Sequence, residues 1–275
     1  MAKVTVEPQV NEKLERLMRL LKELRSAVLA FSGGVDSSFL LKALKLSDIR
    51  FIAVSSVSLT SPPEDIDTAK RLASELGIEH IFVEGTELQR EEFLRNDRRR
   101  CFYCKDSLFR KLIEIKDSRG YCFVLDGSTM DDLNDYRPGL EAARNLGVRS
   151  PLIEAGLYKD EIRVLSRALG LSTWNRPCSA CLSSRIPYGT RISPERLNRI
   201  GMAEKILKGL GFKVVRVRDY WPMAKIEVSR DEIGLLFEEE TREKIIKEIK
   251  STGYTTISID LEGYRQGKLN EFREG

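Results

Sequence analysis

The chain has 275 residues, of which 41% are hydrophobic and 32% are charged, and its formal net charge is +4. This composition is typical of a globular protein and excludes a disordered chain. No apolar run reaches the roughly 18 residues of a membrane-spanning helix, and the N-terminus lacks the apolar core of a signal peptide. We therefore expect a cytoplasmic protein with no membrane partner, and the small net charge does not indicate a nucleic-acid partner.

Hydrophobic periodicity predicts alternating strands and helices over residues 12–170. The predicted strands are 26–31, 50–56, 80–85, 121–128 and 148–154, and the predicted helices are 12–24, 37–46, 62–77 and 158–170. Strands that alternate with helices form a parallel sheet with helices on both faces, so the predicted fold class is α/β.

The regular pattern stops at residues 171–193, which are rich in Ser, Pro and Cys. A second module follows, with predicted helices at 194–211 and 230–253 and predicted strands at 213–221, 224–230 and 255–261. We predict an α/β domain at residues 1–175, a cysteine-containing linker at 176–193 and a small α+β domain at 194–275.

A polar turn, SGGVDSS at residues 32–38, separates the first predicted strand of the sheet from its helix. Backbone N–H groups at a helix N-terminus bind anions, glycines allow close approach and serine hydroxyls donate hydrogen bonds. The turn lacks the lysine of the Walker pattern. It resembles the pyrophosphate loop (PP-loop) of the ATP pyrophosphatase superfamily, whose fold is adenine nucleotide α-hydrolase-like. That resemblance implies ATP and Mg²⁺, with the phosphates held by Ser32, Gly33, Gly34, Asp36, Ser37 and Ser38. The alternative is an ordinary helix N-cap at Asp36 or Ser37.

Residues 126–177 and 180–189 closely resemble the LarE-type sulfur transferases, which help to make the nickel-pincer cofactor. The resemblance implies that ATP adenylates a carboxylate of a pyridinium biscarboxylate mononucleotide and releases pyrophosphate. Sulfur then displaces AMP and leaves a thiocarboxylate. It also implies a homo-oligomer. A tRNA thiolase of the same superfamily and a non-catalytic ATP-binding module are the alternatives.

Four of the five cysteines form two C-x-x-C pairs, Cys101 with Cys104 and Cys178 with Cys181. Paired cysteines in a cytoplasmic protein indicate metal, cluster or sulfur chemistry. Resemblance to family members with additional cysteines implies a 4Fe-4S cluster held by three of the four, with Cys178 and Cys181 at the sulfur chemistry. The alternatives are sacrifice of the Cys181 sulfur itself, a structural zinc, and inert thiols. Cys122 is expected to pack in the core.

Alternation along residues 215–220 places Arg216 and Arg218 on one face of a strand. The resemblance assigns these arginines to the phosphate of the substrate; a solvated strand face with surface ion pairs is the alternative. The other residues assigned to the substrate are Glu204, Glu227, Ser184 and Arg185. Lys159 and Asp132 are assigned to ATP. The alternative for Lys159 is a solvated helix face, and the alternative for Asp132 is an acid that favours the dipole at a helix N-terminus.

Overall fold

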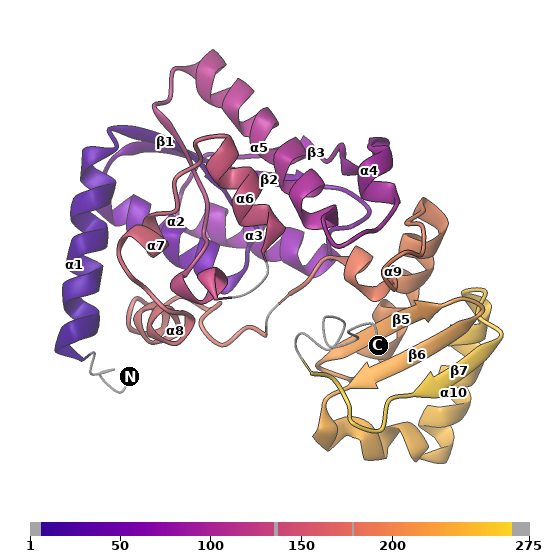
Figure 1. Ribbon diagram of the computed structural model, residues 1–275. Coiled ribbons are helices and arrows are strands. Elements are labelled where there is room, and N and C mark those ends of the chain that lie inside the picture. The colour runs from indigo at the N-terminus through magenta and orange to yellow at the C-terminus, as the bar shows by residue number, and fades with distance from the viewer. Residues whose placement is uncertain (1–6, 135–136, 178, 266–275) are drawn as a thin grey trace. The chain divides into compact units, whose positions relative to one another are not determined.

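The computed structural model describes residues 7–134, 137–177 and 179–265 (Figure 1). The chain forms two compact units, the first comprising Met1–Phe93 and Arg99–Ser179, and the second Leu94–Arg98 and Ala180–Gly275. Each unit has its own sheet, with four strands in the first and three in the second. The predicted class, a parallel α/β sheet with a smaller α+β part, is confirmed. Among the described residues, no helix is long and apolar enough to cross a membrane.

The first unit alternates strands and helices as the periodicity predicts. Its strands are β1 (Ser26–Ala30), β2 (Arg50–Val57), β3 (His80–Glu84) and β4 (Phe123–Leu125). Its α-helices are α1 (Pro8–Glu23), α2 (Val35–Ser47), α3 (Pro63–Glu75), α4 (Glu91–Leu94), α5 (Arg100–Arg119), α6 (Pro138–Asn145), α7 (Pro151–Glu154) and α8 (Lys159–Ala168). Two short 3₁₀ helices, η1 (Glu87–Gln89) and η2 (Met130–Leu133), complete it.

The predicted fifth strand at residues 148–154 is wrong. Arg149 makes a single parallel bridge with Leu125, and Pro151 then begins the short helix α7. Proline has no N–H group to donate to a strand ladder, whereas it is well suited to the first turn of a helix. The pairing therefore stops after one residue.

The sheet of the first unit has the strand order β3-β2-β1-β4, and all three pairings are parallel. From β1 the chain proceeds to β2 and β3 on one side and returns to β4 on the other. The order therefore reverses between β1 and β4. Ligands of open α/β sheets bind beyond the carboxyl ends of the strands at such a reversal. The polar turn after β1 lies at this point.

Strand β1 is buried because helices cover both faces of the sheet. Ala27 and Leu29 pack into the core that includes α1, α2 and α8, while Val28 lies in the core on the other face, with Phe109 and Leu112 of α5. This two-sided burial explains the continuous apolar run of β1 and gives the turn after it a rigid base.

The second unit contains α9 (Pro194–Gly209), β5 (Val215–Tyr220), β6 (Met223–Val228), α10 (Glu239–Ser251), β7 (Thr256–Ile259) and the 3₁₀ helices η3 (Leu182–Arg185) and η4 (Arg230–Phe237). Strand β6 pairs antiparallel with β5 and parallel with β7. Val215 and Val217 of β5 pack in a core with residues of α9 and α10. Because side chains alternate along a strand, Arg216 and Arg218 occupy the other face.

Residues 94–98 belong to the second unit because Asn96 binds the segment after η3. The fully buried Asn96 side chain donates hydrogen bonds to the carbonyl groups of Ile186, Pro187 and Thr190, at 3.3, 2.8 and 2.8 Å. The Gly189 N–H donates to the Asn96 carbonyl at 3.1 Å. These bonds fix the chain that directly follows the residues assigned to the substrate.

Candidate functional site

The turn after β1 forms a cluster of hydroxyl and amide groups at the N-terminus of α2. Ser32 Oγ lies 3.0 Å from Ser37 Oγ and accepts a hydrogen bond from the Gly34 N–H at 3.3 Å. The N-cap residue of α2 is Gly34, rather than Asp36 or Ser37. A glycine supplies no side-chain oxygen to the first-turn N–H groups, so this helix N-terminus is suited to an external anion. Ser38 is fully buried, and its hydroxyl group has no hydrogen-bond partner within the described part of the chain.

Two glycines allow backbone segments to approach this turn. Gly33 has a φ of +73°, and a Cβ atom there would lie 2.6 Å from the Asp65 carbonyl of α3. Gly127 follows β4, and a Cβ atom there would lie 3.1 Å from the Ser37 nitrogen. The loop after β4 therefore lies directly against the first turn of α2. Gly127 falls inside the predicted strand 121–128, whereas β4 ends at Leu125. An Asp-Gly-Ser sequence after a buried run is the turn signal that identifies this loop.

Asp36 is the titratable group of the turn, and burial raises its pKa to about 6. The positive charges of Lys159 and Arg163 act in the opposite direction and favour the carboxylate, while Asp132 and Asp131 disfavour it. A carboxyl group with a raised pKa beside two cations and a helix N-terminus is a common feature of functional sites. The structure thus brings the charges of Asp36, Lys159 and Asp132 into one cluster.

Lys159 and Asp132 form an ion pair at this edge of the sheet. Lys159 Nζ lies 2.9 Å from Asp132 Oδ1, and the Lys159 N–H donates to Asp131 Oδ2 at 2.8 Å. Burial opposes the charge of Asp132, yet the Thr129 N–H and Lys159 hold its pKa below the usual value. Arg137 lies 3.2 Å from the same oxygen of Asp132. Thr129, which was not predicted as a site residue, forms a reciprocal capping box with Asp132.

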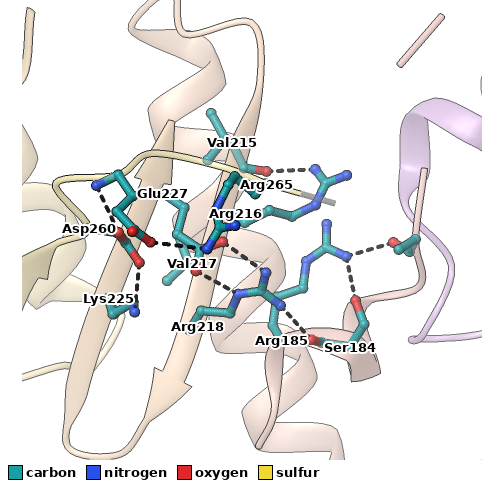
Figure 2. Close-up of polar contacts among 12 residues, drawn as sticks. Ser184, Arg185, Val215, Arg216, Val217, Arg218, Lys225, Glu227, Asp260 and Arg265 are labelled. Atoms are coloured by element: carbon teal, nitrogen blue, oxygen red, sulfur yellow. Dashed lines mark hydrogen bonds and ion pairs between the residues drawn. The ribbon is translucent and has the colours of Figure 1, made fainter. Parts of the chain in front are cut away.

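In the second unit, two arginines form buried bidentate ion pairs. Arg185 contacts both carboxylate oxygens of Glu204, at 2.7 and 3.0 Å, and Arg218 contacts both oxygens of Glu227, at 3.0 and 2.8 Å. Arg185 also donates to Ser184 Oγ at 2.9 Å, while Arg218 donates to the Ser184 carbonyl at 2.8 Å (Figure 2). Bidentate geometry holds both guanidinium groups in fixed orientations. The structure therefore joins Ser184, Arg185, Glu204, Arg218 and Glu227 into one polar network.

Arg216 lies beside this network and projects from β5 on the same side as Arg218 (Figure 2). Its guanidinium group donates to the Val215 carbonyl at 2.7 Å and lies 4.8 Å from the centre of the Tyr264 ring. Burial lowers the pKa of Arg216, and the nearby charge of Arg185 lowers it further. An anion that binds here relieves the repulsion between these arginines.

The cysteines are divided between the two units. Cys101 and Cys104 lie three residues apart near the N-terminus of α5, where Cys101 is exposed and Cys104 half-buried. Cys181 is half-buried at the N-cap of η3 in the second unit. Cys178 lies outside the described residues. Within the described part of the chain, no group of three His, Cys, Asp or Glu residues is arranged to hold a metal ion. Cys122 is exposed just before β4, so the expected core position is wrong.

Comparison with known proteins gives matches over nearly the whole chain. The chain is 38% identical over 262 residues to an uncharacterized protein of Synechocystis sp., covering 95% of this chain and 98% of that protein. It is 36% identical over 268 residues to the pyridinium-3,5-bisthiocarboxylic acid mononucleotide synthase of Lactiplantibacillus plantarum, covering 94% of each. A stretch of 79 residues, 29% of this chain and 18% of the relative, is 38% identical to argininosuccinate synthase of Agrobacterium fabrum. No protein-family model matches the chain.

Proposed function

The chain belongs to the family of pyridinium-3,5-bisthiocarboxylic acid mononucleotide synthases, and from this premise we propose that it is an ATP-dependent sulfur transferase. Its substrate is a pyridinium biscarboxylate mononucleotide, and its product is a thiocarboxylate for the synthesis of the nickel-pincer cofactor. The observation that carries the proposal is the turn after β1, where a helix N-terminus, two serine hydroxyls and Asp36 meet at the reversal of strand order.

The first step is adenylation at this turn. A carboxylate oxygen of the substrate attacks the α-phosphorus of ATP, the bond to the β-phosphate breaks, and pyrophosphate leaves. The first-turn N–H groups of α2 and the hydroxyls of Ser32 and Ser37 bind the phosphates, and Lys159 offsets the charge that pyrophosphate gains. Asp36 fits the Mg²⁺ ion that accompanies ATP, because a buried carboxylate regains its charge beside a cation.

The second step is sulfur transfer. Sulfur attacks the acyl carbon, the bond from that carbon to the phosphate-linked oxygen breaks, and AMP leaves with the oxygen. Adenylation makes this possible because a free carboxylate has no good leaving group. The thiolates of Cys101, Cys104, Cys178 and Cys181 are suitable ligands for a 4Fe-4S cluster, of which three would hold it. Such a cluster, when bound, supplies a replaceable sulfide.

The second unit binds the phosphate of the mononucleotide. Arg185 and Arg218 are held in place by bidentate carboxylate partners. Burial and the charge of Arg185 lower the pKa of Arg216, so a bound phosphate would favour its charged form. This assignment gives the paired glutamates an orienting role: they hold two guanidinium groups in place around the third.

Release of pyrophosphate tests the proposal. The purified protein is incubated with Mg²⁺–ATP in the presence and in the absence of the pyridinium biscarboxylate mononucleotide, under anaerobic conditions. We expect pyrophosphate and AMP only when both substrates are present, and a product in which sulfur replaces one oxygen. Pyrophosphate release at the same rate without the mononucleotide would contradict the assigned substrate. The variant Ser37→Ala should lower the rate.

A further inference from the structure

Arg176 contacts the turn after β1 from a distant part of the sequence. Its Nη1 donates to the Gly33 carbonyl at 2.9 Å, across 143 residues of sequence. Its Nη2 donates to Asp65 Oδ1 of α3 at 3.0 Å. The Arg176 side chain is largely shielded from solvent, with 24% of it exposed. None of the steps described above uses this residue, although it contacts the turn that binds phosphate.

The bond to Gly33 fixes the orientation of one peptide group. In a planar trans peptide the C=O and N–H groups point in opposite directions. When Arg176 holds the Gly33 carbonyl, the N–H of Gly34 must therefore point away from Arg176, and it donates to Ser32 Oγ at 3.3 Å. A glycine with positive φ permits several peptide orientations at similar energy. Arg176 selects the one in which this N–H lies among the hydroxyl groups of the turn.

The backbone of Arg176 is held from the other side. Arg163 of α8 donates from Nη1 to the Trp174 carbonyl and from Nη2 to the Arg176 carbonyl, both at 2.9 Å. Residues 174–176 are thus fastened both to α8 and to the turn. Cys178 follows Arg176 by two residues, and Cys181 by five. One arginine therefore joins the phosphate-binding turn to the start of the cysteine-containing segment.

We infer that Arg176 is a positioning residue that orients the Gly33–Gly34 peptide for phosphate and couples nucleotide binding to the order of residues 171–177. The inference rests on the proposed function for the identity of the nucleotide, ATP. Coupling of this kind is reciprocal. If ATP binding stabilises the contact between Arg176 and Gly33, it also orders residues 171–177. Loss of that contact in turn weakens ATP binding.

The test compares Arg176→Ala and Arg176→Lys with Arg71→Ala, a control on the exposed side of α3. The measurements are the dissociation constant for Mg²⁺–ATP and the hydrogen exchange of residues 30–38 and 171–177, with and without ATP. Without ATP, Arg176→Ala should exchange faster in both segments. Its ATP affinity should fall about tenfold, the effect of losing one charge-assisted hydrogen bond, and ATP should no longer protect residues 171–177. The exchange rates and ATP affinity of Arg176→Lys should lie between those of the wild type and Arg176→Ala, because one ammonium group does not reproduce the planar guanidinium that reaches two acceptors.

The inference would be overturned if Arg176→Ala had the same hydrogen exchange and ATP affinity as the wild type. It would also be overturned if Arg71→Ala changed exchange and ATP affinity as much as Arg176→Ala does. If Arg176→Ala does not fold, Asp65→Asn takes its place, because this variant keeps the contact between Arg176 and Gly33 but removes the charge of the other partner of Arg176. Residues 171–177 should then exchange faster than in the wild type. Unchanged exchange of these residues would overturn the inference. Wild-type protein that binds no Mg²⁺–ATP would contradict the proposed function instead, while the exchange data without ATP still decide the role of Arg176.

Discussion

At the scale of single residues, the charge of Asp36 destabilises the unliganded protein. Burial raises the pKa of Asp36 from 3.8 to about 6, so the folded chain holds this proton more tightly than the unfolded chain. The contribution to stability is therefore full below pH 4 and is lost as the pH rises through 6. At about 1.4 kcal/mol per pKa unit, the ionised side chain costs no more than about 3 kcal/mol at neutral pH. A buried carboxylate whose charge costs this much stability is expected to bind a ligand.

The substitution Asp36→Asn should therefore raise the melting temperature at pH 8 and leave it nearly unchanged at pH 4. Pyrophosphate release should fall at the same time, because the carboxylate is lost from the turn. Thermal melts across the pH range, with Asp67→Asn as a control at an exposed site on α3, measure the first effect. A lower melting temperature for Asp36→Asn at pH 8 would show that its charge stabilises the fold.

The arginines of the second unit also differ in how much their charges stabilise the fold. Removing one partner of a buried ion pair leaves an unpaired charge and costs about 3–5 kcal/mol. Glu204→Ala should therefore destabilise the protein strongly, since Glu204 is 3% exposed and pairs with Arg185. Arg216→Leu should lower the melting temperature less than Glu204→Ala does, because burial and the charge of Arg185 already disfavour the charged form of Arg216.

Arg216→Leu should also raise the KM for the mononucleotide more than the KM for ATP. Steady-state kinetics with each substrate varied in turn measures the difference. An equal rise in both KM values would argue against a phosphate site at Arg216, and a strong loss of stability would assign this arginine to the fold.

Sequence reasoning at this scale succeeds where the signal is local. The turn of residues 32–38 and the alternation that puts Arg216 and Arg218 on one face are both readable from neighbouring residues. Arg176 and Gly127 were missed because their roles depend on partners far away in the chain: Arg176 meets Gly33 across 143 residues, and Gly127 meets Ser37 across the reversal of the sheet. The bidentate partners of Arg185 and Arg218 likewise require the folded strands.

Among the elements, the nucleotide site depends on the close approach of the loop after β4 to the first turn of α2. Gly127→Ala places a methyl group 3.1 Å from the backbone of Ser37, so the loop or the helix must shift. Overpacking of this kind costs about 1–3 kcal/mol. We expect weaker ATP binding together with a lower melting temperature, measured by calorimetry and thermal melts.

The matched control is Gly156→Ala. Gly156 has a φ of +77°, and a Cβ atom there meets nothing within 4 Å. This variant should lose stability through backbone strain while ATP affinity stays at the wild-type value. If Gly156→Ala weakened ATP binding, or if Gly127→Ala left it unchanged, the results would argue against a role of the β4 loop in the nucleotide site.

Helix and strand types were predicted well where apolar periodicity was strong, as in β1, α2 and β5. Errors occurred where another constraint intervened. Pro151 ends the expected fifth strand after one bridge. The expected helix at 230–253 divides into η4 and α10, because Glu238 has an extended ψ of 131°. Helix α5 was not predicted, and its Arg100 is buried.

At the scale of the whole molecule, the distribution of cysteines bears on the source of sulfur. The sequence contains two C-x-x-C pairs, Cys101 with Cys104 and Cys178 with Cys181. One thiolate suffices to attack an acyl adenylate, whereas three are needed to hold a cubane cluster with one iron open. We therefore expect an oxygen-sensitive 4Fe-4S cluster in protein purified anaerobically.

Iron and sulfide analysis with an absorption spectrum measures the cluster. Cys181→Ala should abolish the cluster and sulfur transfer together, while Cys122→Ala, which changes an exposed cysteine outside both pairs, should retain both. Iron-free protein that loses the mass of one H₂S from Cys181 per turnover would replace the cluster with a sacrificial cysteine. The homo-oligomer implied by the family stays a prediction that light scattering can measure.

In the proposed reaction ATP activates a carboxylate of the substrate as an acyl adenylate, and the transfer of an oxygen isotope from that carboxylate to AMP tests this step. The pyridinium biscarboxylate mononucleotide is prepared with a heavy oxygen isotope in its carboxylates and turned over with unlabelled ATP. The oxygen that attacks the α-phosphorus leaves with AMP, so the account predicts one labelled oxygen in the phosphate of each AMP and none in pyrophosphate. AMP that carries no label, formed while the thiocarboxylate accumulates, would contradict it.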